Sequence, residues 1–112
     1  MNILIPLIDN NSYNSKVSIH FGSCSYFGIY NNNLKTLNII ENKINPKNKN
    51  IPPIENILKK DINCIFCIQI GQKAKEILTK KNIKLKTGNY KIISEVIKNI
   101  NNLNDNINIC NH

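Results

Sequence analysis

Ile3-Leu4-Ile5-Pro6-Leu7-Ile8 is an unbroken apolar run that ends at the turn-forming residues Asp9-Asn10-Asn11. A run of this length between turn signals is typical of a strand buried on both faces. Such a strand lies in the middle of a sheet, with other elements covering each side. We therefore expect the rest of the chain to assemble around residues 3–8.

The rest of the chain predicts four further strands and three helices. Strands are expected at 26–30, 34–41, 62–70 and 83–86, and helices at 51–60, at 72–81 and over Ile92 to Ile100. Asparagine tolerates a positive φ, so Asn31-Asn32-Asn33 predicts a hairpin turn. The order β-β-β-α-β-α-β-α predicts an α/β fold with one mixed five-stranded sheet and helices on its faces.

The chain length of 112 residues indicates a single domain. We expect the domain to span 1–102, followed by an Asn-rich tail at 103–112. A domain of this size buries roughly two thirds of its unfolded surface and folds without disulfides or structural metal. Any cofactor would therefore be a cargo and not a structural support.

The composition is strongly biased and basic. Ile, Asn and Lys make up more than half of the residues, and the formal net charge is +8. Such a charge attracts anions, and the simplest interpretation of the lysines is a solvated surface. Arginine is absent and aromatic residues make up only 6% of the chain, so the main tools for reading bases are missing. We expect no specific nucleic-acid recognition.

No apolar stretch is long enough to span a membrane as a helix, and residues 1–6 do not resemble a signal peptide. The sequence thus predicts a cytoplasmic protein with no membrane partner. In a reducing compartment, Cys24, Cys64, Cys67 and Cys110 are expected to be thiols.

The candidate ligand-binding residues begin in Ser18-Ile19-His20-Phe21-Gly22. A neutral imidazole at His20 suits a transition metal, and the thiol of Cys24 suits an iron–sulfur species. The alternative is a loop histidine held by a backbone carbonyl. Two ligands cannot complete a tetrahedral structural site, but they can hold a preassembled cluster weakly, as a carrier would.

A second candidate segment is the turn at Gly71, which leads into a helix. Backbone N–H groups and the positive end of that helix, with Lys73 and Lys75, would accept an anion. Ligands in such sheets bind beyond the carboxyl ends of the central strands. The loop of His20 and the Gly71 turn should meet at that edge.

Other combinations carry less chemistry. Cys64 and Cys67 have CxxC spacing, but residues three apart in a strand point to opposite faces, so buried packing is the preferred interpretation. Cys110 and His112 form a chelating pair only on the terminal tail. Of the carboxylates only Asp9 lies at the expected edge, and no nucleophile elbow or phosphate loop is present. Nothing here requires an enzyme.

The chain resembles the dinitrogenase iron–molybdenum cofactor biosynthesis family over about residues 1–102. The resemblance rests on residues 18–22 with Phe27, on Ile70-Gly71 with Ala74, and on Asn82-Ile83. That family includes NifX-like carriers and the C-terminal domain of NifB. The segment 42–51 lacks the Gly- and His-rich character common in the family, and 68–72 lacks an extra glycine and a proline.

The resemblance implies a ribonuclease-H-like fold without nuclease acids and a non-enzymatic carrier of an iron–sulfur or iron–molybdenum-type cluster, bound transiently. By analogy His20 would ligate the metal, while Gly22 and Gly71 shape the pocket. Partners would be proteins that donate or accept the cluster, and the carrier would be a monomer or weak dimer. Two alternatives stay open: a regulatory or interaction module that binds a partner protein or small anion without metal, and nucleic-acid binding through lysines.

Overall fold

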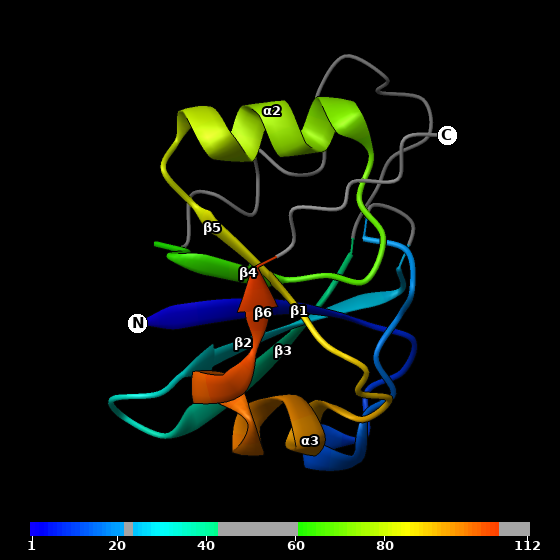
Figure 1. Cartoon of the computed structure of the whole chain (residues 1–112). Helices are drawn as coiled ribbons and strands as arrows, with labels where there is room; N and C mark the ends of the chain where they lie inside the picture. Colours follow the sequence, from blue (N-terminus) through cyan, green and yellow to red (C-terminus); the bar gives the residue numbers. More distant parts are fainter. Residues whose placement is uncertain (22–23, 43–60, 106–112) are drawn as a thin grey trace.

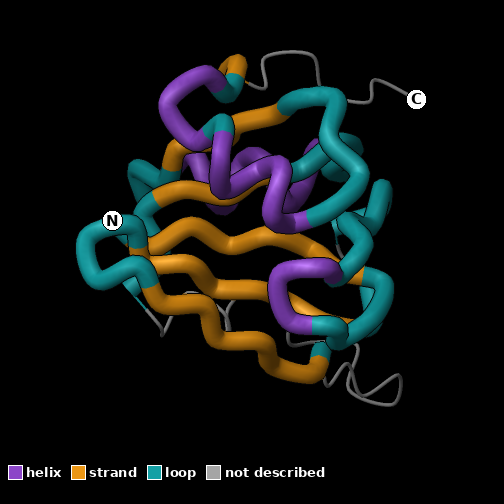
Figure 2. Tube along the Cα trace, turned by 90° about the horizontal axis from the view of Figure 1, so that it is seen from below, coloured by secondary structure: helices purple, strands orange, loops and turns teal. Residues whose placement is uncertain are grey.

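The computed structural model describes residues 1–21, 24–42 and 61–105 as one six-stranded mixed sheet in the order β3-β2-β1-β4-β5-β6. Figure 1 shows the sheet with its helices, and Figure 2 shows the same chain from below. The strands are β1 (Asn2–Leu7), β2 (Tyr26–Asn31), β3 (Thr36–Glu41), β4 (Cys64–Phe66), β5 (Lys84–Thr87) and β6 (Asn104–Asp105). The helices are α2 (Gln72–Lys80) and α3 (Ile93–Lys98), with 3-10 turns η1 (Ser12–Asn14) and η2 (Ile100–Asn102).

β1 lies in the interior of the sheet, as its apolar run predicts. It pairs antiparallel with β2 and parallel with β4, and residues 3–7 are all buried. Its side chains alternate between two cores. Leu4 belongs to the core that includes Leu78 of α2, whereas Ile3 and Ile5 belong to the core that includes Ile93 of α3.

The two helices therefore cover opposite faces of the sheet (Figure 1). α2 ends where Asn82 adopts a φ of 58°, and the N–H of Ile83 turns back to the carbonyl of Leu78 at 3.0 Å. α3 begins where the Glu95 carboxylate accepts a hydrogen bond from the N–H of Ile92 at 3.2 Å. The α/β fold with helices on both faces of a mixed sheet is confirmed. The helix expected at 51–60 lies outside the described residues.

Pro6 sits inside β1 without leaving a ladder bond unmade on the β2 side. The N–H of Asn32 reaches the carbonyl of Met1 at 3.2 Å, so odd-numbered residues of β1 bond to β2. The backbone N–H and C=O groups of even-numbered residues point toward β4, as the hydrogen bond from the N–H of Asn63 to the carbonyl of Asn2 at 3.0 Å shows. Pro6 therefore needs no N–H toward β2, and on the other side it cannot donate to β4.

Two strand predictions need correction. The strand expected at 62–70 is confined to β4, because its ladder with β1 reaches only to the pair Leu4–Ile65, before Pro6. Within the tail expected from 103 onward, Asn104 and Asp105 instead form β6, which pairs antiparallel with Thr87 and Lys86. The described sheet thus has six strands where the sequence predicts five.

The hairpin between β2 and β3 is confirmed, but its mechanism differs from the expectation. The Asn31 side chain accepts hydrogen bonds from the N–H groups of Asn33 and Leu34 at 2.9 and 3.0 Å. The positive φ, 54°, falls on Lys35 and not on an asparagine. Asparagine contributes its carbonyl oxygen here, as in an Asx-turn.

Gly28 provides a test of this packing. A Cβ at this position would stand 2.7 Å from Ile93 Cδ1 and 3.1 Å from Leu7 Cδ1, and Ile93 is fully buried. We expect Gly28→Ala to lower the free energy of unfolding by about 1–2 kcal/mol through overpacking. At Gly71 no atom lies within 4 Å of a Cβ, so Gly71→Ala should change stability by less than about 0.5 kcal/mol.

Urea unfolding of the two variants beside the wild type measures both effects. Equal stability of Gly28→Ala and Gly71→Ala would contradict the close packing of α3 on β2.

Candidate functional site

The loop that carries His20 is inserted between the carboxyl ends of β1 and β4. The Ser18 N–H donates to the carbonyl of Pro6 at 2.8 Å, and Val17 forms an antiparallel bridge with Leu7. Farther along, the N–H of Gln69 donates to the carbonyl of Ile19 at 3.1 Å. The loop thus replaces β4 beside β1 at the point where Pro6 ends their ladder.

His20 forms an isolated parallel bridge with Gln69, two residues before Gly71. This contact brings the histidine loop and the Gly71 turn to the same edge of the sheet, as the sequence predicts. The two segments lie far apart along the chain, and the backbone bond from Gln69 joins them directly. The edge is the one expected for a ligand in an open α/β sheet.

The backbone of His20 is fixed while its side chain is exposed. The buried hydroxyl of Ser18 donates to the carbonyl of His20 at 3.0 Å, and the N–H of His20 lies 3.2 Å from the same hydroxyl oxygen. The hydroxyl group therefore fixes the backbone of the loop at His20 and leaves the imidazole without a role in this contact. A histidine on a fixed backbone with an accessible ring is well placed to bind a ligand.

The Gly71 turn presents the N-terminus of α2. Gly71 is exposed and is the N-cap residue, with φ −69° and ψ 153°. This φ is open to any residue, so the glycine is not required by the backbone conformation, although the space in front of it is empty. The first turn contains no acidic residue, and Lys73 is exposed there. The electrostatic potential at this end of the helix is therefore positive.

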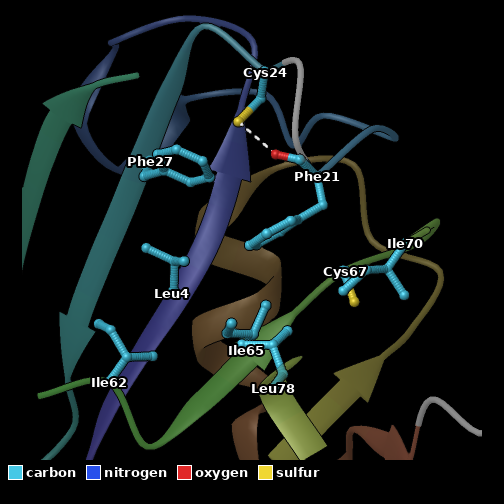
Figure 3. Close-up of a cluster of buried hydrophobic side chains, with 9 residues drawn as sticks. All are labelled: Leu4, Phe21, Cys24, Phe27, Ile62, Ile65, Cys67, Ile70 and Leu78. Atoms are coloured by element: carbon cyan, nitrogen blue, oxygen red, sulfur yellow. Dashed lines mark hydrogen bonds between the residues drawn. The ribbon is translucent and has the colours of Figure 1, made fainter. Parts of the chain in front are cut away.

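Cys24 is near the loop but is buried in the core under α2. Its Sγ donates to the carbonyl of Phe21 at 3.2 Å, and the rings of Phe21 and Phe27 pack at 5.7 Å between centroids (Figure 3). Burial raises the pKa of the Cys24 thiol to about 11. The thiol form therefore prevails at neutral pH, in an apolar environment.

The other residues that the sequence singles out lie in a surface loop, in the two cores or outside the described residues. Asp9 accepts hydrogen bonds from the N–H of Lys16 at 2.8 Å and from the Asn11 amide at 3.2 Å, so it shapes its own loop. Cys64 and Cys67 are buried thiols in different cores, which confirms the packing interpretation of the CxxC spacing. Gly22, Cys110 and His112 lie outside the described residues.

In residues 1–21, 24–42 and 61–105, no three His, Cys, Asp or Glu side chains gather closely enough to hold a metal ion. A separate hollow of about 610 Å³ lies at the opposite edge of the sheet, where β1, β4 and β5 begin. Its walls include Asn2, Asp61 and Lys81. It shares no residue with the loop of His20.

Three residues that build the site were given no role from the sequence: Ser18, although it belongs to the candidate stretch at 18–22, and Gln69 and Asn42. The Asn42 amide donates to the carbonyl of Cys24 at 2.8 Å and fixes the far end of the loop. The spacing of Ser18 and His20 was a usable signal, because serine hydroxyls commonly bond to backbone two residues away. Gln69 gave no local signal, since its role is a long-range backbone bond.

The sequence matches one family model, and the fold is similar to several solved structures. The family model described as dinitrogenase iron-molybdenum cofactor matches residues 1–103. The protein PH0822 is 26% identical, with a TM-score of 0.77, over 96% of this chain and 98% of its own. A Thermotoga protein, TM1290, provisionally described as NifB, is 20% identical with a TM-score of 0.76, covering 93% and 91%.

The apo form of the orange protein from Desulfovibrio gigas has a TM-score of 0.79 at 13% identity, again covering 93% of this chain and 91% of that chain. At such identities the Thermotoga and Desulfovibrio comparisons show a shared fold. A search of curated protein sequences found no match. Among the helices that the structure describes, none has the length and apolar character to cross a membrane.

The buried position of Cys24 predicts an unusual pH dependence of its alkylation. Only the thiolate reacts, and a raised pKa keeps the thiol protonated to higher pH. We expect the rate at Cys24 in the folded chain to be half-maximal near pH 11, the pKa of its thiol. In the urea-unfolded chain the rate should be half-maximal near pH 9, the ordinary value.

Iodoacetamide labelling followed by peptide mass spectrometry measures Cys24 separately from the other cysteines. A half-maximal rate near pH 9 in the folded protein would contradict the burial of this thiol.

Proposed function

Because the chain belongs to the dinitrogenase iron–molybdenum cofactor family, we propose that it binds and carries an anionic iron–sulfur or iron–molybdenum-type cluster. It does so without catalysing a reaction, and the cluster is its transient cargo. The observation that supports this proposal is the contact between the loop of His20 and the turn before α2. That contact brings one candidate metal ligand and one anion-attracting helix terminus to the same edge.

In this proposal His20 supplies a bond to a metal of the cluster. Its exposed imidazole can reach a ligand in solvent, and the Ser18 hydroxyl holds the backbone so that binding costs little loop entropy. A single exposed imidazole gives a weak, reversible bond. Weak binding suits a carrier, which must release its cargo to the next protein.

The Gly71 turn compensates the negative charge of the cluster. The backbone N–H groups of the first turn of α2 and the ammonium of Lys73 attract an anion. Because Gly71 has no Cβ and nothing stands within 4 Å of that position, a bulky cluster can approach the backbone closely. Gly22, which lies outside the described residues, is assigned a similar shaping role from the family resemblance.

Cys24 is the second ligand in this proposal. Ligation requires the thiol to lose its proton and its hydrogen bond to Phe21. A coordinated metal favours the thiolate strongly, and the Cys24 side chain would have to turn its sulfur out of the core. His20 is therefore the first contact, and Cys24 binds only after its side chain leaves the core.

The partners in this proposal are cofactor maturation proteins that donate or accept the cluster. An exposed ligand at a sheet edge allows transfer between two proteins without unfolding either of them. The formal net charge of +8 would favour encounters with acidic partners and with the anionic cluster itself.

The test is anaerobic reconstitution of the full chain with iron and sulfide, read by visible absorption and metal analysis. We expect wild-type protein to retain iron and His20→Ala to lose most of it. Asn10→Ala is the matched control, because Asn10 is exposed in the preceding loop and has no role in the site. Its iron content should equal that of the wild type.

Equal iron retention by wild type and His20→Ala would contradict the assigned role of His20. The competing function, a module that binds a small anion or a partner protein without metal, makes a different prediction. It gives no iron retention in any variant, together with a thermal midpoint that rises with added phosphate compounds.

A further inference from the structure

β3 forms one end of the described sheet, and within residues 1–21, 24–42 and 61–105 nothing gives it the usual protection of an edge strand. It has six residues, Thr36-Leu37-Asn38-Ile39-Ile40-Glu41, with an uninterrupted register against β2 and no proline or bulge. The interior of the strand, Leu37 to Ile40, has no charged residue. β6, at the other end, is only two residues long, which is itself a protection.

The pairing pattern shows which backbone groups of β3 point away from the sheet. The N–H of Asn42 donates to the carbonyl of Ser25 at 3.0 Å, one step beyond the pair Glu41–Tyr26. Even-numbered residues of β3 therefore bond to β2, and odd-numbered residues direct their N–H and C=O groups outward. Along this edge the outward groups belong to Leu37, Ile39 and Glu41.

The charges at the ends of β3 are complementary to each other. Lys35 stands immediately before the strand and Glu41 is its last residue, and both are exposed. Two antiparallel copies of this strand would bring each Lys35 to the Glu41 of the other copy. A parallel arrangement would place like charges together, which destabilises a strand pair.

We propose that β3 is a self-association edge, which pairs antiparallel with β3 of a second copy about a twofold axis at Asn38. In this register Leu37 lies opposite Ile39 of the other copy, and both have outward backbone groups available for hydrogen bonds. Their side chains are half-buried on the α3 side of the sheet, so pairing covers apolar surface that the monomer exposes. The two sheets become one continuous sheet.

Hydrogen-bond direction and charge together select this register. Because opposed residues must share a face, odd-numbered residues oppose odd-numbered ones. A shift by one allowed step would place Glu41 opposite aliphatic Leu37, or leave it beyond the end of the partner strand. Only the register centred on Asn38 pairs Lys35 with Glu41 twice. This proposal does not depend on cluster binding.

Sedimentation velocity of the full chain over a wide concentration range tests the association. We expect a concentration-dependent dimer for the wild type. Lys35→Glu and Glu41→Lys each replace two ion pairs with two like-charge pairs and should raise the dimer Kd about tenfold. The double variant Lys35→Glu/Glu41→Lys restores opposite charges and should recover the wild-type Kd.

Lys91 is exposed two residues before α3, and Lys91→Glu is the matched control for net charge, which should leave the Kd near that of the wild type. Three outcomes would overturn the proposal: a monomer at every concentration, single variants that dimerise like the wild type, or a double variant that stays dissociated. A monomer at every concentration is also the result expected if another segment of the chain, or a different protein, occupies the β3 edge.

A crosslinking experiment tests the register itself. Asn38 would face its own copy in a non-hydrogen-bonded pair, where the Cα atoms lie about 4.5 Å apart, a distance that suits a disulfide. In a Cys110→Ser background, Asn38→Cys should form a disulfide-linked dimer on mild oxidation. Thr36→Cys, on the same strand but away from the axis, should not. Equal crosslinking of both variants would refute this register.

Discussion

The hydrogen bond from the N–H of Ser18 to the carbonyl of Pro6, 2.8 Å long, marks the place where β1 exchanges β4 for the His20 loop as its neighbour. Up to Leu4, β1 pairs with β4. At Pro6 the backbone has no N–H to donate, and the carbonyl is taken by the incoming loop. The chain after β4 therefore diverges from β1, and residues 16–20 fill the space between them. One proline thus determines where the edge of the sheet opens.

The rest of the site depends on that opening. Gln69 lies far enough from β1 to bond to Ile19, and this bond sets the distance between the His20 loop and α2. The same inserted loop is fixed from the other face, because the N–H of Val17 donates to the carbonyl of Lys91 just before α3. The one loop therefore contributes to both cores, since Val17 packs in the core under α3 and Phe21 in the core under α2.

Much of the fold was predictable because it follows from local sequence patterns. The central place of β1 follows from its unbroken apolar run, and the hairpin follows from its three asparagines. The opposite faces of Cys64 and Cys67 follow from the two-residue period of a strand. The short length of β4 was not predictable from its own apolar residues, because the limit is imposed by Pro6 on another strand. β6 has two residues and no pattern of its own, and only its pairing with β5 makes it a strand.

The candidate site divides in the same way. The position of His20 and the proximity of the Gly71 turn follow from the order of strands, since both come after central strands at their carboxyl ends. The burial of Cys24 does not follow, because spacing along the chain gives no information about which core its side chain enters. Its contacts with Phe21 and its raised pKa are consequences of tertiary packing.

Amide NMR of the ¹⁵N-labelled chain tests directly whether the His20 loop and the Gly71 turn form one binding edge. A paramagnetic iron–sulfur cluster is added under anaerobic conditions, and line broadening is recorded for each residue. We expect the amide signals of His20, Gln72 and Lys73 to broaden together. The signals of Asn63 and Lys84, at the opposite ends of β4 and β5, should stay sharp. Broadening confined to one of the two segments, or centred on Asn63 and Lys84, would contradict a single binding edge.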